Sequence, residues 1–355
     1  MVKRVGLFVV LAWMAAGIGC GSSSHPNHLA YVTLTSVNQI VGFNVDNVSG
    51  ALTQISTSPF KTGPSPVSIV LHPSNKFVYV ANAAENDISV FTVGTGGALS
   101  EALPRVKTGI SPVALAIDSN GSFLFAANSV SNTISAYGIN GTSGALQEVA
   151  GSPFAAPNPL ALAVAPSGKF LYAADANDSA LLGFSINAGA LTPMPGFPVG
   201  AGPNPSSVAI DPSGHFLYTT NIAGTTFVGF AIAAAGSVTY VPGTIFGAGT
   251  NPSAATLDPS GKFLYVANLG SNNVSAYTIN SANGVPAAVK GSPFAAGTGP
   301  SFVVADTTGK FLFVGNQSAK TISGFSIDPS SGVLTGIKQA PVSVLTAATS
   351  MAIAK

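Results

Sequence analysis

The chain is built from a unit that repeats every 46 to 48 residues almost to its C-terminal end. A proline opens each complete copy, at Pro66, Pro112, Pro159, Pro205, Pro252 and Pro300. A later segment of each copy runs from an aromatic residue to a polar one, as in Tyr265-Val266-Ala267-Asn268. Blades of four-stranded propellers repeat every ~40 to 50 residues. The repeat therefore indicates a single domain, although a length of 355 residues alone would suggest two or three.

The unit from Asn251 to Gly297 predicts four short strands and the turns between them. The strands are expected at residues 253–257, 262–267 and 274–279, and more weakly after Gly284. Asp258-Pro259-Ser260-Gly261 has the residues of a type I turn. The second strand is apolar on both faces, so it predicts a sheet that is covered on both sides. Such a sheet is a blade that must stack on neighbouring blades.

The two ends of the chain complete each other. Residues 29–45 match the second and third strands of a unit without a first strand, and residues 349–355 match a first strand alone. Pairing these ends makes a seventh blade and removes the open sheet edge. We therefore predict an all-β fold over residues 29–355. It is a closed seven-bladed propeller with four antiparallel strands per blade.

Residues 1–20 have the pattern of a signal peptide. Lys3 and Arg4 precede an apolar stretch, and Cys20, the single cysteine of the chain, follows it. Cys20 and the small residues after it resemble a bacterial lipoprotein cleavage site, with Gly17 where that pattern usually has Leu. We expect lipidation at Cys20, a tether over residues 21–28, and attachment in the cell envelope. An ordinary signal peptide and a secreted product remain the alternative.

Composition excludes some functions. Charged residues make up 7% of the chain and the net charge is +1, so there is no basic stripe for nucleic acid. Hydrophobic residues reach 46%. No uninterrupted apolar stretch of about 18 residues follows the signal, so we attribute them to stacked blades. A redox-cofactor propeller would need tryptophan side chains to clamp the cofactor. The single tryptophan, Trp13, lies in the signal peptide, so no cofactor is expected. We expect a monomer whose partner is an envelope protein or a neutral, sugar-like ligand.

Ligands of propellers usually bind at the mouth of the central channel. The loops that join one blade to the next carry no charged or histidine side chain, which predicts a neutral mouth. An asparagine ends most second strands, at Asn82, Asn128, Asn221, Asn268 and Asn316. We interpret these as local hydrogen-bonding caps of the following loops.

Two departures from the repeat are candidate sites, and a third is not. Asp175 replaces the asparagine in one blade, and with Asp178 it is a candidate catalytic or cation-binding pair. Arg105 and Lys107 replace a Gly-Ser-Pro-Phe segment and are candidate ligand-binding residues. The third departure is a pair of histidines.

His72 and His215 occupy turns on different blades, at the face opposite the mouth. We interpret both as solvated turn residues. No metal site is predicted from them.

The Tyr-Val-Ala-Asn repeats, the Asp-Pro-Ser-Gly-Lys turn and the Gly-Ser-Pro-Phe segments carry a family resemblance. Over about residues 29–355 the chain resembles the seven-bladed propeller lactonase family, with its 6-phosphogluconolactonase-like and muconate cycloisomerase-like members. It is also similar to the YVTN-repeat propellers of cell surfaces. The lactonase resemblance implies hydrolytic ring opening of a sugar lactone by His, Arg and Glu side chains at the mouth.

No residues of this chain match that charged set at the mouth. The sequence therefore predicts a binding or structural module of the cell envelope. The alternative is a lactone hydrolase that acts on a sugar lactone at the channel mouth with Asp175, Asp178 or backbone groups. Such chemistry needs a base for water and a donor for the oxyanion.

Overall fold

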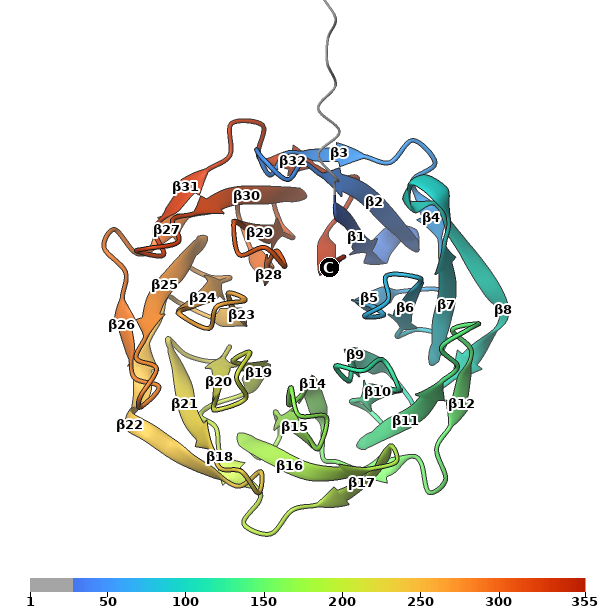
Figure 1. Cartoon of the computed structure of the whole chain (residues 1–355), viewed down its shortest axis with the longest axis horizontal. Helices are drawn as coiled ribbons and strands as arrows, with labels where there is room; N and C mark the ends of the chain where they lie inside the picture. The colour runs from blue at the N-terminus through green and yellow to red at the C-terminus, as the bar shows by residue number, and fades with distance from the viewer. Residues whose placement is uncertain (1–27, 355) are drawn as a thin grey trace, which may run out of the picture.

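A computed structural model describes residues 28–354 of the chain. Within this range the strands form seven sheets arranged as blades around a central channel (Figure 1). The predicted seven-bladed propeller is confirmed. The predicted signal peptide and lipidation site lie outside the described residues. In the described part of the chain, no helix has the length and apolar character needed to cross a membrane.

The strands are numbered in chain order. The innermost strands are β5 (Pro66–Leu71), β9 (Pro112–Ile117), β14 (Pro159–Val164), β19 (Pro205–Ile210), β23 (Pro252–Leu257), β28 (Pro300–Ala305) and β33 (Ala348–Ile353). The second strands are β6 (Phe77–Asn82), β10 (Phe123–Asn128), β15 (Phe170–Asp175), β20 (Phe216–Asn221), β24 (Phe263–Asn268), β29 (Phe311–Asn316) and β1 (His28–Leu34). The third strands are β7 (Asp87–Val93), β11 (Thr133–Ile139), β16 (Ala180–Asn187), β21 (Thr226–Ile232), β25 (Asn273–Ile279), β30 (Thr321–Ile327) and β2 (Gln39–Val45).

The outermost strand of a blade is either continuous or split in two. It is continuous as β8 (Leu99–Lys107) and β22 (Val238–Gly247). The split strands are β12 (Leu146–Glu148) with β13 (Phe154–Ala155), β17 (Ala190–Pro193) with β18 (Val199–Gly200), β26 (Pro286–Ala288) with β27 (Phe294–Ala295), β31 (Leu334–Gly336) with β32 (Val342–Ser343), and β3 (Leu52–Gln54) with β4 (Phe60–Lys61). Two short 3-10 turns, η1 (Thr35–Val37) and η2 (Thr95–Gly97), complete the elements.

We number the blades along the chain by their innermost strands, from blade 1 (β5) to blade 6 (β28), and call the blade of β33 and β1 to β4 blade 7. The predicted unit of blade 5 is close to the observed one. The amide of Gly261 donates to the carbonyl of Asp258 at 2.9 Å, as a type I turn requires. The second strand starts at Phe263, one residue later than expected, and the weak fourth strand is split into two pieces.

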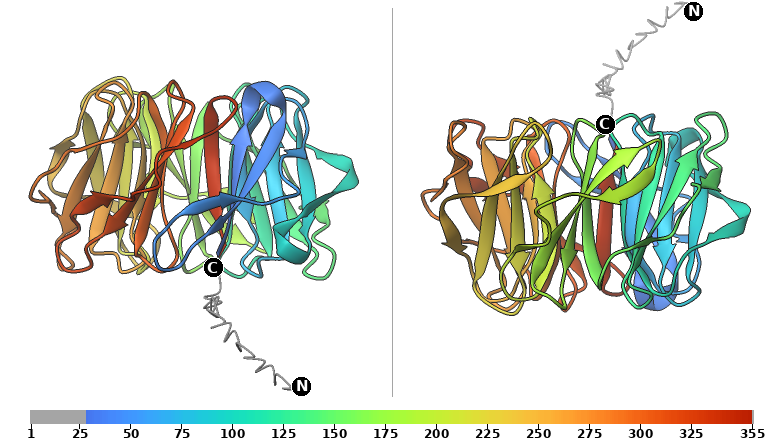
Figure 2. Two further views of the ribbon diagram at one scale, coloured as in Figure 1. Left: turned by 90° about the horizontal axis from the view of Figure 1, so that it is seen from above. Right: turned by 90° about the horizontal axis from the view of Figure 1, so that it is seen from below.

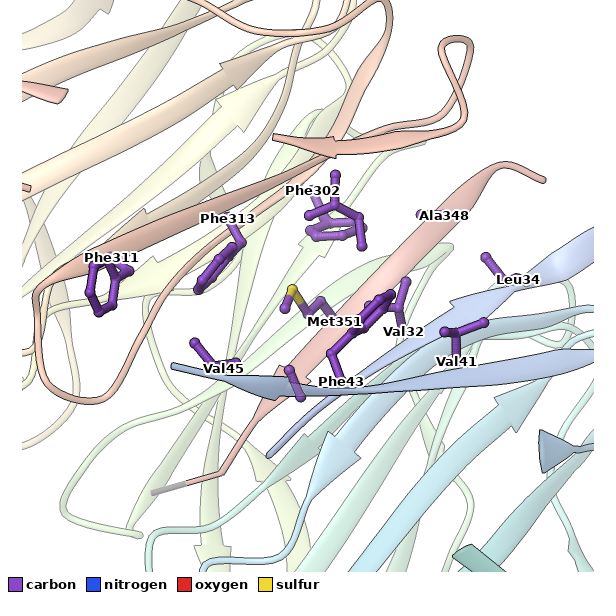
Figure 3. Close-up of a cluster of buried hydrophobic side chains, with 12 residues drawn as sticks. Val32, Leu34, Val41, Phe43, Val45, Phe302, Phe311, Phe313, Ala348 and Met351 are labelled. Atoms are coloured by element: carbon purple, nitrogen blue, oxygen red, sulfur yellow. The ribbon is translucent and has the colours of Figure 1, made fainter. Parts of the chain in front are cut away.

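The two ends of the described chain close the ring. β33 pairs antiparallel with β1, with Val32 opposite Met351. Figure 3 shows Met351 and Phe43 of blade 7 facing Phe302 and Phe313 of blade 6 in one buried cluster. The predicted pairing of the N- and C-terminal strands is therefore confirmed, and the joined blade is packed like the others.

The hydrophobic core is divided among the blade interfaces. Each cluster of buried apolar side chains in the described chain joins two neighbouring blades, and each of the seven interfaces has one. The apolar residues of the sequence are thus buried between neighbouring sheets. Burial of apolar side chains contributes roughly 25 cal/mol per Å², so no blade is expected to be stable without its neighbours.

A tyrosine and a glycine join five of these interfaces. The tyrosine of a second strand donates its hydroxyl to a glycine carbonyl in the hairpin between the third and fourth strands of the next blade. The pairs are Tyr31 to Gly97, Tyr79 to Gly144, Tyr172 to Gly236, Tyr218 to Gly284 and Tyr265 to Gly332. Burial raises the pKa of Tyr172 to about 12, so this hydroxyl stays a donor at neutral pH.

The two faces of the ring differ in their loops. Each blade-joining loop and each loop between second and third strands lies at one face, which we call the mouth face. The turns before the second strands lie at the other, and we call it the turn face. β33 ends and β1 begins at the turn face, where Figure 2 shows the end of the chain. Asp175, at the end of β15, therefore lies toward the mouth face and both predicted turn histidines toward the turn face.

Replacing Gly332 tests the interface contact. Gly332 has φ +73°, and a Cβ there would lie 2.4 Å from the ring of Phe263 in the preceding blade. We expect Gly332→Ala to lower the free energy of unfolding by about 2 kcal/mol or more, measured by denaturant titration. Tyr265→Phe removes one buried hydrogen bond and should cost about 1 kcal/mol. Gly336→Ala is the matched control, because no atom lies within 4 Å of the added Cβ. A Gly332→Ala protein as stable as the control would contradict this account.

Candidate functional site

Four consecutive blades carry a hydroxyl side chain at the mouth end of the innermost strand. The second residue of the innermost strand is Ser206, Ser253, Ser301 or Thr349 in blades 4 to 7. Each of these hydroxyls donates to the carbonyl of the first residue in the next innermost strand, for example Ser253 Oγ to Pro300 at 2.8 Å. Blades 1 to 3 have Val67, Val113 and Leu160 instead. The wall at the mouth is therefore uncharged, with a hydroxyl arc on one side and an apolar arc on the other.

The second ring of loops at the mouth face is not neutral. The loops between second and third strands carry the exposed side chains of Glu85, Asp178 and Lys320. The expectation of a wholly neutral mouth is therefore wrong for these loops, although it holds for the innermost strands. The charges lie on separate blades, so they do not form one cluster.

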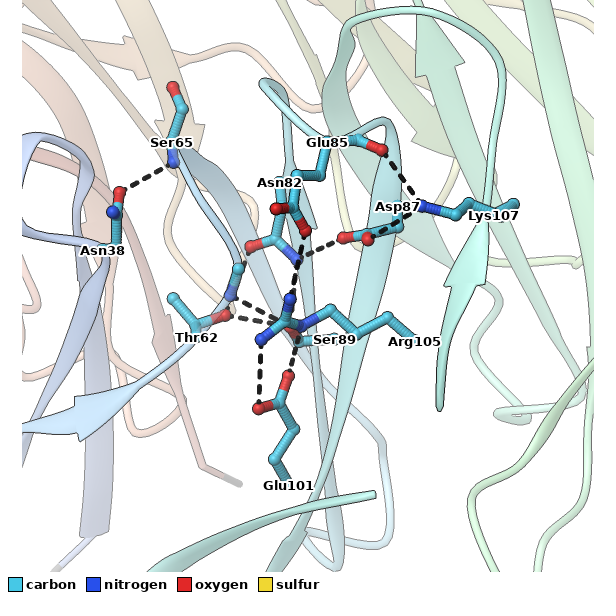
Figure 4. A network of polar contacts seen from close by, with 11 residues as sticks. Asn38, Thr62, Ser65, Asn82, Glu85, Asp87, Ser89, Glu101, Arg105 and Lys107 are labelled. Atoms are coloured by element: carbon cyan, nitrogen blue, oxygen red, sulfur yellow. Dashed lines mark hydrogen bonds and ion pairs between the residues drawn. The ribbon is translucent and has the colours of Figure 1, made fainter. Parts of the chain in front are cut away.

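Arg105 and Lys107 lie on β8, the outermost strand of blade 1. Figure 4 shows their charges paired within the same blade. Arg105 Nε lies 2.7 Å from Glu101 and its Nη1 lies 3.2 Å from Glu85, while Lys107 Nζ lies 3.4 Å from Asp87. The hydrogen bond that Arg105 donates to Glu101 raises the pKa of Arg105 further. Solvent still reaches Arg105 and Lys107 and weakens these pairs, and the ligand-binding role of these two residues stays a prediction.

The recurring asparagines are buried in a repeated polar network. The Nδ2 of Asn82, Asn128, Asn268 or Asn316 donates at 2.9 Å to a serine seven residues later on the third strand. In blades 5 and 6 the asparagine Oδ1 also accepts the amide of a linker glycine, as Asn316 does from Gly297 at 3.1 Å. The network joins second strand, third strand and incoming linker. The expectation that the asparagines cap the following loop is therefore wrong, because their side chains bond to the third strand and the linker instead.

Blade 3 changes every member of this network. Asp175 replaces the asparagine, and Ala180 and Leu182 replace the polar residues five and seven positions later. The incoming linker is also one residue shorter, and Pro157, which has no N–H, follows Ala156 where Gly297 follows Ala296. Asp175 Oδ1 accepts the amides of Asn177 and Asp178 at 3.0 and 3.2 Å. Asp175 Oδ2 is buried and has no hydrogen-bond donor.

Two other network oxygens, Oδ1 of Asn128 and of Asn221, are also unpaired. Those are neutral amides whose nitrogens keep hydroxyl partners. Asp175 differs because the unpaired atom belongs to an ionisable carboxyl with 1% exposure. Burial raises the pKa of Asp175; the amides of Asp178 and Asn177 oppose the rise, and the charge of Asp178 adds to it.

Asp175 and Asp178 line one cavity of about 200 Å³ in the groove between blades 2 and 3. Its other walls are apolar, and they come from β13, the linker, β16 and the segment from Pro193 to Pro198. The lining residues are Ala155, Pro157, Leu182, Gly183, Phe184, Pro193, Phe197 and Pro198. The structure therefore brings together the two predicted acidic residues, and it places them beside a blade groove rather than at the channel axis. A pocket with a perturbed carboxyl is a candidate functional site.

The two turn histidines have different surroundings. His72 is buried, and the prediction that it is a solvated turn residue is wrong. Its Nδ1 accepts the amide of Ser74 at 3.0 Å, so Nε2 carries the proton and donates to the carbonyl of Gly121 in blade 2 at 3.0 Å. The longer imidazole reaches across the interface, whereas the aspartates at this turn position bond within their own turn.

His215 lies on the exposed side of its turn, beside Ser213. Among residues 28–354, no group of three or more His, Cys, Asp or Glu side chains is placed to hold a metal ion.

The chain belongs to the seven-bladed β-propeller lactonase family. The family described as "Lactonase, 7-bladed beta-propeller" matches residues 22–162 and 231–348. The match leaves out residues 163–230, which include Asp175 and Asp178. No curated protein matches the chain.

Solved structures share the fold at low identity. A candidate 6-phosphogluconolactonase from Bacteroides fragilis is 24% identical with a TM-score of 0.81, covering 94% of this chain and 99% of that one. A second one from Bacteroides uniformis is 19% identical with a TM-score of 0.80, covering 93% and 100%. The periplasmic gluconolactonase of Pseudomonas aeruginosa is 18% identical with a TM-score of 0.74, covering 93% and 99%. These likenesses show the architecture alone.

The sequence contained the signal for the whole blade 3 cavity, but only Asp175 and Asp178 were identified from it. Ala180 and Leu182 depart from the repeat as clearly as Asp175 does. The spacing from Phe154 to Pro159 is one residue shorter than that from Phe294 to Pro300. Taken together, these changes predict that the carboxyl of Asp175 lacks hydrogen-bonding partners.

Replacing Asp175 by asparagine tests its electrostatic strain. A raised pKa in the folded state means that stability is full below the unfolded pKa of about 3.9 and falls as pH rises and the buried carboxyl ionises. We expect Asp175→Asn to raise the melting temperature at pH 7 by about 2 °C or more. The gain should vanish near pH 3.5.

The control is Glu148→Gln, which makes the same charge change at an exposed site and should shift stability little. Differential scanning calorimetry across pH gives the comparison. A gain that is independent of pH would contradict the ionisation account.

Proposed function

We propose that this chain is an exported, lipid-anchored propeller of the lactonase family that binds a neutral, sugar-like ligand at the channel mouth. The hydroxyl arc of Ser206, Ser253, Ser301 and Thr349 carries the proposal. These side chains are half-buried, uncharged and fixed by their bonds to the next blade. Each hydroxyl donates its proton to a carbonyl of the next blade and keeps lone pairs that can accept a hydrogen bond from a sugar hydroxyl.

The opposite side of the mouth supports the same ligand class. Val67, Val113 and Leu160 offer an apolar surface, and sugars present an apolar face as well as hydroxyls. A phosphorylated sugar would need cations to offset its charge. Arg105 and Lys107 lie on the outermost strand and are paired with acids, so they do not supply that charge at the axis. Anchoring through Cys20 and residence in the cell envelope are part of the proposal and rest on the sequence pattern.

A lactone hydrolase is the second candidate, favoured by the cavity that holds Asp175 and Asp178. Ring opening needs a base to take a proton from water and a donor for the developing oxyanion. The exposed Asp178 would be the base, and Asp175, whose pKa is raised, the donor. Among the solved neighbours, one is described as a periplasmic gluconolactonase.

A panel of sugars and sugar lactones, plain and phosphorylated, tests both candidates on the purified full chain. We expect binding of a neutral sugar, measured by calorimetry, without lactone hydrolysis above the spontaneous rate. Ser253→Ala should weaken that binding several-fold, because a mouth acceptor is lost. Ser281→Ala is the control, since Ser281 is exposed in a hairpin at the turn face.

Turnover near 1 s⁻¹ or above, common among enzymes, would instead establish the hydrolase. Loss of that turnover in Asp175→Ala would then assign the donor. Absence of both binding and turnover across the panel would contradict the proposed ligand class.

A further inference from the structure

We propose that the cavity beside Asp175 binds a small organic ammonium ion with an apolar body. This site lies in the groove between blades 2 and 3, so it is separate from the channel mouth and does not depend on the function proposed there. The Asp175 pocket, as we call it, has the lining residues given above.

The first argument is the unpaired carboxylate oxygen. Asp175 Oδ2 is buried without a donor, and Pro157, Ala180 and Leu182 stand where other blades supply or share a hydrogen bond at this position. A buried acceptor without a partner is costly, and a charged one more so. A cation held in the cavity would offset the charge of Asp175, and its N–H groups would reach the exposed carboxylate of Asp178.

The second argument is the sign of the charge around the cavity. Asp178 lines it together with Asp175, and it is exposed at the surface. The ion pairs among the described residues involve Arg105 and Lys107 of blade 1, so no cation of blade 3 is paired with either aspartate. The pocket thus offers two acids and no resident counter-ion, which favours a cationic ligand over an anion or a neutral sugar.

The third argument is the character of the remaining walls. Leu182, Phe184 and Phe197 give apolar and aromatic surface beside the acids. Hydrated metal ions prefer oxygen ligands in larger numbers than two carboxylates provide. An alkyl or aryl ammonium instead places its hydrocarbon against Leu182 and its charge near an aromatic ring and a carboxylate. The volume of about 200 Å³ lies below the roughly 300 Å³ of sites for drug-sized ligands, so the ligand is small.

The groove between blades 5 and 6 is an internal comparison. A cavity of about 260 Å³ lies there in the corresponding place, lined by Ser323, Gly324 and Phe325 in the positions of Leu182, Gly183 and Phe184. Its lining includes no ionisable residue, and Asn316 donates to Ser323 at 2.9 Å. The propeller architecture therefore supplies the groove, and the changes of blade 3 supply the charge.

Binding should depend on pH in one direction. Asp178 is the ionisable group that faces Asp175; the linker, β16 and the segment from Pro193 to Pro198 place none on the cavity. The ammonium ion keeps its charge at and below neutral pH, and the carboxylates lose theirs as pH falls. Affinity should therefore be highest near neutral pH. It should fall before pH reaches the ordinary aspartate range near 3.9, because the pKa of Asp175 is raised.

Benzylamine and benzyl alcohol provide the test, since they differ mainly in charge. We would titrate each into the purified full chain and follow ligand-observed NMR signals, at low and at physiological salt. We expect benzylamine to bind at least about tenfold more tightly than the alcohol, and Asp175→Asn to weaken it about tenfold or more. This variant should fold, because five other blades have asparagine at that position.

Glu85→Gln is the charge-matched control, in the corresponding loop of blade 1, and it should leave benzylamine binding unchanged. Equal binding of amine and alcohol would overturn the proposal, as it would show an apolar cavity without charge recognition. Unchanged binding in both Asp175→Asn and Asp178→Asn would also overturn it. Displacement of benzylamine by equimolar Ca²⁺ would assign the pair to an inorganic cation and would equally overturn it.

Discussion

The contact between neighbouring blades is the interaction on which this structure depends. The side chain near the start of a second strand, a phenylalanine in six blades and Leu29 in blade 7, packs on a glycine of the next blade, and five tyrosines donate to such a glycine carbonyl. The glycine is required at Gly332 by its positive φ and by the ring of Phe263. Blades 2 and 6 have Phe125 and Phe313 in place of the tyrosine, so packing persists there without the hydrogen bond. Sheets of modest size become one rigid ring because this contact recurs at each interface.

The architecture could be predicted from the sequence because it repeats. Each repeat shows the same turn and the same two-faced second strand, so an error in one copy is corrected by the others. The ring closure followed from two incomplete units, 29–45 and 349–355, that need each other. The strand bounds were less certain, as at Lys262, which belongs to the turn. The prediction that His72 is solvated is wrong because its partner, Gly121, belongs to another blade. A repeat pattern describes one blade and says little about contacts across the interface.

The candidate site was predictable only in part, for the same reason. Asp175 and Asp178 stand out in the sequence because they break the repeat. The effect of Asp175 depends on the hydrogen-bonding partners that blade 3 lacks. The missing hydrogen-bonding partners are spread over a linker and a third strand, and only the fold brings these together. Blade 3 gives up a satisfied polar network, and with it some stability. Natural proteins commonly accept such strain where a site needs an unpaired charged group.

Ring closure also constrains when the protein can finish folding. β1 is among the first strands of the propeller to be synthesised, and its partner β33 ends at Ile353, next to the C-terminal end. Until β33 arrives, β1 has an exposed edge at the interior of an incomplete ring, and such edges invite pairing with other chains. These contacts join residues far apart in the sequence, and pairing of such distant strands is slow. The last strand of the propeller therefore decides whether the edge of the first one is covered or stays open to other chains.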